Sequence, residues 1–125
     1  MSWTKPRGLR PGDLVGIAAP SAVFDAGLLA RGVAELEALG LRVRVPEGID
    51  ERARFAAGTP QRRARELRAL FEDDEVAAIV CARGGAGAIH LLPVLDPLLA
   101  QRHPKALVGC SDVTFTIRPQ AFLRM

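Results

Sequence analysis

Short apolar runs alternate with helical stripes along the 125 residues of this chain, and this alternation restricts its fold more than any other feature. Apolar residues at three- and four-residue spacing predict one helix from an N-cap at Asp25 to about Leu39, and a second that begins at Thr59 and Pro60. The apolar runs are too short for helices and predict strands near residues 14–19, 41–45, 76–81 and 106–110. Strands alternating with helices predict an α/β domain with a Rossmann- or flavodoxin-like parallel sheet flanked by helices.

The length predicts a single domain over residues 1–125. We expect a polar connection over residues 46–58, a turn and short helix over residues 84–92, and another helix from residue 93 to about residue 100. The second strand alternates apolar and charged residues, which places it nearer an edge of the sheet.

The charge pattern argues against nucleic acid as a partner. The net charge is only +3, and acidic residues lie within and after the densest basic group, Arg62, Arg63, Arg65 and Arg68. This pattern predicts a solvated helix face rather than a track for phosphates. Aromatic residues make up only 5% of the chain and Tyr is absent, which also argues against a surface that stacks bases.

Two further features bear on location and cofactors. The N-terminus has no apolar signal segment and no apolar run reaches membrane-spanning length, so we expect a cytoplasmic protein with no membrane partner. Cys81 and Cys110 each end an apolar run without metal-ligand spacing, which predicts buried reduced thiols and no metal site.

Ser111 is the first candidate for chemistry, because it lies between a buried strand and a helix start. Such a turn exposes the hydroxyl, and the following backbone N–H groups can hold an oxyanion. The same position also suits an N-cap, which is the structural alternative. In a parallel sheet, ligands gather at the carboxyl ends of the strands. We therefore expect three segments to form one rim: residues 19–21, 83–87 and 109–112.

The glycine segment Arg83 to Gly87 allows three interpretations. Its backbone N–H groups could approach a phosphate, although the pattern is neither a Walker loop nor the dinucleotide fingerprint. It could be only a tight turn that needs positive φ angles. It could also offer an N–H to an oxyanion beside Ser111.

Taken together, five segments resemble the N-terminal half of the LD-carboxypeptidase family, the serine peptidases of the S66 type, which also includes the microcin C self-immunity peptidases. The segments are LRPGDLVGIAAPS, AGT, AIVCARGGAG, LLPVLD and PKALVGCSDVT. The resemblance covers about residues 5–114 and leaves residues 115–125 as a divergent tail.

The resemblance implies a function and a site. Ser111 corresponds to the nucleophile of the family, and the backbone N–H groups of Asp112 and Gly85 correspond to its oxyanion hole. The family removes the terminal D-alanine from cytoplasmic muropeptides during peptidoglycan recycling, and it uses neither a metal nor an organic cofactor. The expected partner is therefore a muropeptide or another small peptide.

The chain also departs from the family pattern. An aromatic residue usually stands where this chain has Ala86, and another where it has Cys110, which alters the pocket wall. The family's general base His and its orienting Glu lie in a C-terminal domain that this sequence lacks. Pro119 would interrupt the helix expected after the nucleophile, so residues 115–125 suggest a truncated or frame-shifted end.

These departures leave the source of the general base open. His90 and His103 have no obvious acidic partner, so surface or capping roles are expected for both. We expect a chain that is weakly active or inactive alone, with a missing half or a homodimer as the remaining partners. Two alternatives stay open: a non-catalytic module that binds a small molecule or nucleotide, and a non-functional fragment whose exposed face pairs or aggregates.

Overall fold

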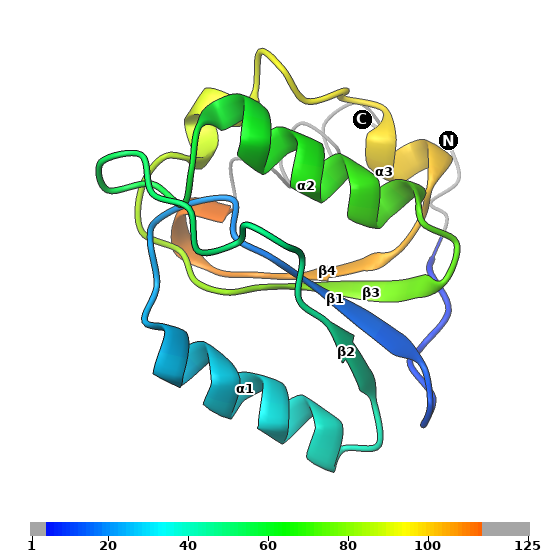
Figure 1. Ribbon diagram of the computed structural model, residues 1–125. Coiled ribbons are helices and arrows are strands. Elements are labelled where there is room, and N and C mark those ends of the chain that lie inside the picture. The colour runs from blue at the N-terminus through cyan, green and yellow to red at the C-terminus, as the bar shows by residue number, and fades with distance from the viewer. Residues whose placement is uncertain (1–4, 114–125) are drawn as a thin grey trace.

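A four-stranded parallel sheet runs through the centre of the computed structural model, which describes residues 5–113 (Figure 1). Its strands, in the order β2-β1-β3-β4, pair in parallel throughout. The strands are β1 (Leu14–Ala18), β2 (Arg42–Arg44), β3 (Val76–Cys81) and β4 (Ala106–Val108). The predicted fold class and strand positions are confirmed, with three of the strands shorter than expected at their ends and β2 at an edge.

The two long helices begin where the sequence predicts. Helix α1 (Ala26–Ala38) follows Asp25, whose side chain accepts a hydrogen bond from the N–H of Leu28 at 2.9 Å. Helix α2 (Pro60–Glu72) follows Thr59, whose hydroxyl accepts from the N–H of Arg62 at 3.2 Å. Both caps satisfy backbone donors that the first helical turn leaves without partners.

The third helical region is shorter than predicted. A 3-10 turn, η1, spans Ala88–Leu91, but the helix expected over residues 93–100 is only α3 (Leu99–Arg102). Pro97 disfavours the helical conformation at Asp96 and has no N–H to donate. The carboxylate of Asp96 instead accepts from the N–H of Leu98 at 2.9 Å, which stabilises a turn.

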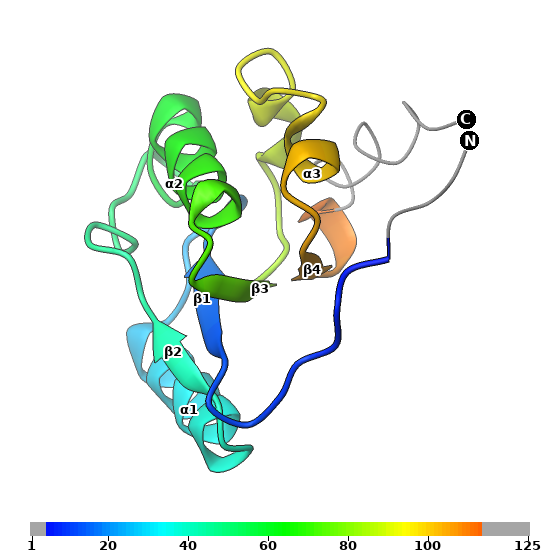
Figure 2. The ribbon, with the colours of Figure 1, turned by 90° about the vertical axis from the view of Figure 1, so that its right-hand side faces the viewer.

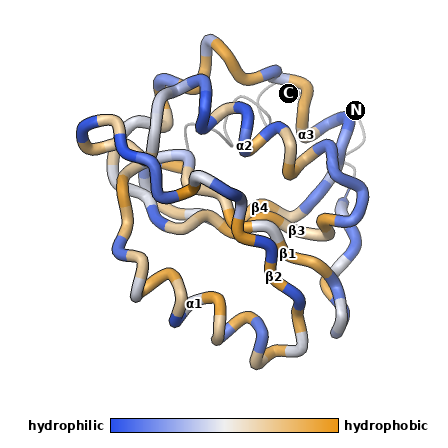
Figure 3. Tube along the Cα trace, viewed as in Figure 1, coloured by the Kyte–Doolittle hydropathy of each residue, from blue (hydrophilic) through white to orange (hydrophobic). Residues whose placement is uncertain are grey.

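The helices cover the two faces of the sheet unequally (Figure 2). Helix α2, η1 and α3 lie on one face, where Leu67, Ile79 and Leu91 are at most 1% exposed. Helix α1 lies alone on the other face, where its half-buried Leu29, Val33 and Leu36 pack against a smaller cluster. Apolar residues recur along both helices in Figure 3. The unequal burial of α1 and α2 therefore reflects how well neighbouring elements cover these residues.

None of the helices within residues 5–113 combines the length and apolar character needed to cross a membrane. The divergent tail, including Pro119, lies outside the described residues.

Candidate functional site

The three segments predicted to form a rim meet at the carboxyl ends of the strands. The N–H of Ala22, just after β1, donates to the carbonyl of Gly84, just after β3, at 3.3 Å. The N–H of Ala88 donates to the carboxylate of Asp112, just after β4, at 2.7 Å. Segments that are distant in sequence are therefore joined by direct hydrogen bonds at one edge of the sheet.

Ser111 lies at this edge, exposed to solvent, as the first residue of the 3-10 turn η2 (Ser111–Val113). Its φ angle is 56°, in the left-handed region that costs a residue with a side chain about 1–2 kcal/mol. The residue before the turn is Cys110, whose carbonyl accepts from the N–H of Val113 at 3.2 Å. The N-cap role of Ser111 stays a prediction, and its strained turn resembles the turns that present serine nucleophiles.

Gly84 lies directly against Ser111. A Cβ atom at Gly84 would lie 2.9 Å from both the carbonyl oxygen of Cys110 and the Cβ of Ser111, so only glycine fits. The next residue, Gly85, has a φ angle of 108°, and a Cβ there would lie 2.4 Å from the Cβ of Ala22. The turn therefore needs glycine at both positions. It brings backbone next to the serine, while the part played by the Gly85 N–H stays a prediction.

The sequence predicts that Arg62, Arg63, Arg65 and Arg68 form a solvated face, and this is wrong for Arg62 and Arg63, which are half-buried and buried. Arg65 and Arg68 are exposed, but Arg63 is only 2% exposed. The Arg63 guanidinium donates to three carbonyl oxygens, those of Pro20 at 2.8 Å, Gly87 at 2.8 Å and Gly58 at 3.1 Å. Burial lowers the pKa of Arg63 and the negative charge of Asp112 opposes that change, but an arginine stays charged in either case.

Glu66 is the second buried charged residue of α2 that the sequence analysis missed. One carboxylate oxygen accepts from the N–H of Ala19 at 2.8 Å, and the other lies 2.7 Å from the Arg62 guanidinium. Burial raises the pKa of Glu66, while the Ala19 N–H and Arg62 act in the opposite direction. The burial of charged residues on α2 had one signal in the sequence, which is helical spacing. Arg63, Leu67 and Leu70 fall on the stripe that faces the sheet.

The two cysteines are free, as predicted, but they are not both buried. Cys81 is half-buried at the end of β3, and burial raises the pKa of its thiol to about 12. Cys110 is exposed beside Ser111, so the prediction of a buried thiol there is wrong. The exposed stretch begins within β4, where Val108 is already 57% exposed.

Neither histidine is arranged as a general base. His103 precedes β4 and lines a cavity with Asp74, Glu75 and Val76, at the amino end of the strands and away from Ser111. His90 is exposed on η1, and within residues 5–113 no acidic side chain hydrogen-bonds to its imidazole. The surface roles predicted for both agree with these positions.

Among the same described residues, His, Cys, Asp and Glu side chains form no group of three or more that could hold a metal ion. The expectation of a site without a metal or cofactor stays a prediction.

A parallel sheet with a strained serine turn at its carboxyl edge is an arrangement of α/β proteins that use serine chemistry. The family model for the LD-carboxypeptidase N-terminal domain, Peptidase_S66, matches residues 15–120, and the chain belongs to this family. The family resemblance inferred from the sequence is confirmed.

The relatives extend well beyond the part that matches. The chain is 38% identical over 111 residues to the "Probable murein peptide carboxypeptidase" of Bacillus subtilis (strain 168), covering 89% of this chain and 35% of that protein. It is 32% identical over 101 residues to the "Murein tetrapeptide carboxypeptidase" of Pseudomonas aeruginosa PAO1, covering 80% of this chain and 33% of that protein. The chain thus spans about a third of the length of these relatives.

Solved structures agree with this placement. The MccF-like protein from Bacillus anthracis str. Ames matches with a TM-score of 0.83 and 30% identity, over 90% of this chain and 35% of that one. The microcin C7 self-immunity protein MccF in complex with aspartyl sulfamoyl adenosine matches with a TM-score of 0.81 and 27% identity, over 89% of this chain and 34% of that one.

Proposed function

We propose that residues 5–113 form the nucleophile-bearing part of a serine LD-carboxypeptidase, which releases terminal D-alanine from a muropeptide or a similar small peptide. The observation that carries this proposal is the strained, exposed Ser111 turn packed against Gly84, in a chain of the LD-carboxypeptidase family. The names of two relatives, both murein peptide carboxypeptidases, support the substrate class. We further propose, as the family resemblance implies, that the protein acts in the cytoplasm and in peptidoglycan recycling.

In the proposed reaction, the Ser111 hydroxyl attacks the carbonyl carbon of the peptide bond before D-alanine. The carbonyl oxygen takes up the negative charge and accepts hydrogen bonds from the N–H groups of Asp112 and Gly85. The C–N bond then breaks, the amine of D-alanine takes the proton that left the serine, and water hydrolyses the remaining serine ester. Each proton transfer needs a base, and we propose that a segment outside residues 5–113 supplies it, which agrees with the positions of His90 and His103.

A second candidate function keeps the binding site without the chemistry. MccF was solved with aspartyl sulfamoyl adenosine, so a chain of this family could hold a small aminoacyl nucleotide at the same rim. A rise in melting temperature with adenosine nucleotides, in a chain that never releases D-alanine, would favour this candidate.

Catalysis is tested by adding a C-terminal polypeptide from a relative to this chain. The 125-residue chain alone should release D-alanine from muropeptide tetrapeptides very slowly, because a protonated serine is a weak nucleophile. The C-terminal two-thirds of the Bacillus subtilis relative, added as a separate polypeptide, should restore turnover, and Ser111→Ala should remove it. The C-terminal polypeptide alone is the control. Restored turnover that survives Ser111→Ala, or no turnover from two folded polypeptides, would contradict the proposal.

A further inference from the structure

Arg63 connects two segments of the rim with the loop before α2. Its guanidinium donates to Pro20 at the end of β1, to Gly87 in the glycine turn and to Gly58 before α2. The three carbonyls belong to segments that approach one another only in the folded chain. A guanidinium has a rigid, planar fork of donors, so it fixes the relative positions of its acceptors better than a single ammonium does.

The hydrogen-bonded path continues to the serine turn. Ala88 follows Gly87 and is fully buried, and its N–H donates to the Asp112 carboxylate at 2.7 Å. Asp112 follows Ser111 directly, and its charge acts on the buried guanidinium of Arg63. The glycine turn is therefore held on one side by Arg63 and on the other by Asp112.

The neighbouring arginine shows that this arrangement is specific. Arg62 is also mostly covered, but it pairs with Glu66 at 2.7 Å and donates to the carbonyl of Ala57 at 3.2 Å. Among the described residues, the hydrogen bonds and ion pairs of its guanidinium go to Ala57, Glu51 and Glu66 and not to the glycine turn. A buried cation is also a poor source of stability, because its loss of hydration offsets much of the attraction that it gains. The three carbonyl groups that Arg63 binds therefore explain its burial better than a gain in stability does.

We infer that Arg63 is a positioning residue that holds the glycine turn at a fixed place beside Ser111, so that the Gly85 and Asp112 N–H groups point at one oxyanion. This inference rests on the proposed function for its catalytic meaning. It assigns Arg63 no contact with the substrate, so its removal should lower the rate of the chemical step and leave binding nearly unchanged.

The test compares Arg63→Met and Arg63→Lys with Arg62→Met, the matched control on the same helix. In the chain supplemented with the C-terminal polypeptide, Arg63→Met should lower kcat about 100-fold, as the loss or misplacement of one oxyanion donor does, with KM within about threefold. Arg63→Lys should recover part of this loss, and Arg62→Met should keep kcat within about threefold of the wild-type value.

A second readout does not need catalysis. In the full 125-residue chain, the Ala88 amide should exchange its hydrogen at least about tenfold faster in Arg63→Met, while the Ile79 amide in the core stays protected. Arg62→Met should leave the Ala88 amide as protected as in the wild type. This measurement reports on the turn alone, so it separates a local release from a general loss of stability.

The outcomes are distinguishable. Unchanged kcat and unchanged Ala88 exchange in folded Arg63→Met would overturn the inference and leave the proposed function intact. Equal changes in Arg63→Met and Arg62→Met would also overturn it. If Arg63→Met does not fold, Arg63→Lys decides by the same two measurements. If the supplemented wild type never releases D-alanine, the proposed function fails, and Ala88 exchange alone decides whether Arg63 holds the turn.

Discussion

Helices α1 and α2 have the same length of 13 residues and the same kind of N-cap, yet they are buried to very different extents. Six residues of α2 are buried, whereas none of α1 is. Leu28 and Leu39, on and just after α1, remain 64% and 70% exposed. Length and capping therefore start a helix, but the neighbouring elements decide how much it contributes to the core.

The topology explains the difference. With the strand order β2-β1-β3-β4, the right-handed crossovers from β2 to β3 and from β3 to β4 pass over the same face of the sheet. The crossover from β1 to β2 runs in the opposite direction and places α1 on the other face. Within residues 5–113, one face therefore receives α2, η1 and α3, and the other receives α1 alone.

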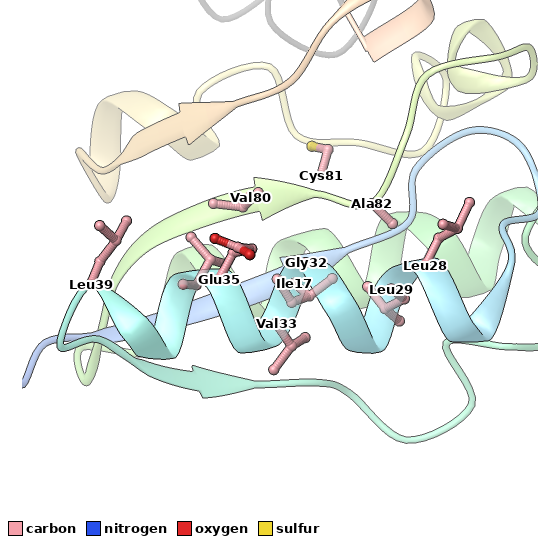
Figure 4. A pocket seen from close by; sticks show the side chains of 11 residues that line it. Ile17, Leu28, Leu29, Gly32, Val33, Glu35, Leu39, Val80, Cys81 and Ala82 are labelled. Carbon is pink, nitrogen blue, oxygen red and sulfur yellow. The ribbon is translucent and has the colours of Figure 1, made fainter.

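The α1 face holds an apolar cavity of about 360 Å³ between the helix and the sheet (Figure 4). Leu29 and Val33 of α1 line it together with Ile17, Val80 and Ala82. Arg63, which contacts the glycine turn beside Ser111, by contrast comes from the well-packed side, because it belongs to α2. The candidate site thus lies next to the better-packed face of the sheet.

The largest effect should come from truncating the α2 face. Leu67 is 1% exposed in the main core cluster, so Leu67→Ala should lower the free energy of unfolding by about 2–5 kcal/mol. Urea denaturation followed by circular dichroism measures this loss. A loss below about 1 kcal/mol would mean that the α2 face is no better packed than the α1 face.

The same substitution on α1 should cost much less. Leu36 is only half-buried in the smaller cluster, so Leu36→Ala should lower the free energy of unfolding by about 1 kcal/mol. Urea denaturation under the same conditions gives the matched comparison with Leu67→Ala. Equal losses for the two variants would remove the contrast between the faces.

The rim differs from both faces because it stores backbone strain. Ser111 has a φ angle of 56°, so Ser111→Gly should raise the free energy of unfolding by up to about 1 kcal/mol while it removes the proposed nucleophile. Thermal melting tests this, with Ser111→Ala as the control that removes the hydroxyl but keeps the strain. A stability gain in Ser111→Ala equal to that in Ser111→Gly would exclude strain as the cause.

The pH dependence of stability should show a smaller difference between the helices. Burial raises the pKa of Glu66 in the folded state, so the folded protein holds this proton more tightly than the unfolded chain. Its contribution is fully present below the unfolded pKa and is lost as the pH rises through the folded value. Glu66→Gln should therefore remove part of the decline in stability above about pH 4.3, the ordinary pKa of Glu.

Glu35, exposed on α1, supplies the matched control for this experiment. Glu35→Gln controls for the loss of one carboxylate from a helix, in urea denaturation measured from pH 4 to pH 7. A Glu66→Gln profile parallel to that of the wild type would show that Glu66 does not contribute to the pH dependence of stability.

Features that depend on local pattern could be predicted from the sequence. Strand positions, the Asp25 and Thr59 caps and the convergence of the rim segments follow from apolar runs, cap residues and the geometry of parallel sheets. The sequence also identified the serine turn and the glycine turn that the structure brings together. The catalytic roles of Ser111, Asp112 and Gly85 remain predictions.

Features that depend on distant partners could not be predicted in this way. The helical spacing of Arg63 is consistent with burial, but its partners, the carbonyls of Pro20, Gly58 and Gly87, come from distant segments that no local pattern identifies. The short α3 is a different kind of error, because the signal was local. Pro97 disfavours the helix over residues 93–100 that the apolar pattern favoured.

The central claim is that Ser111 is the nucleophile presented by this rim. Mass spectrometry of the supplemented chain after treatment with a fluorophosphonate tests it most directly, because this reagent modifies activated serines. We expect one adduct, on Ser111, absent in Ser111→Ala and formed more slowly in Arg63→Met than in Arg62→Met. D-alanine release that continues with Ser111 unmodified, or an adduct on another residue, would contradict the claim.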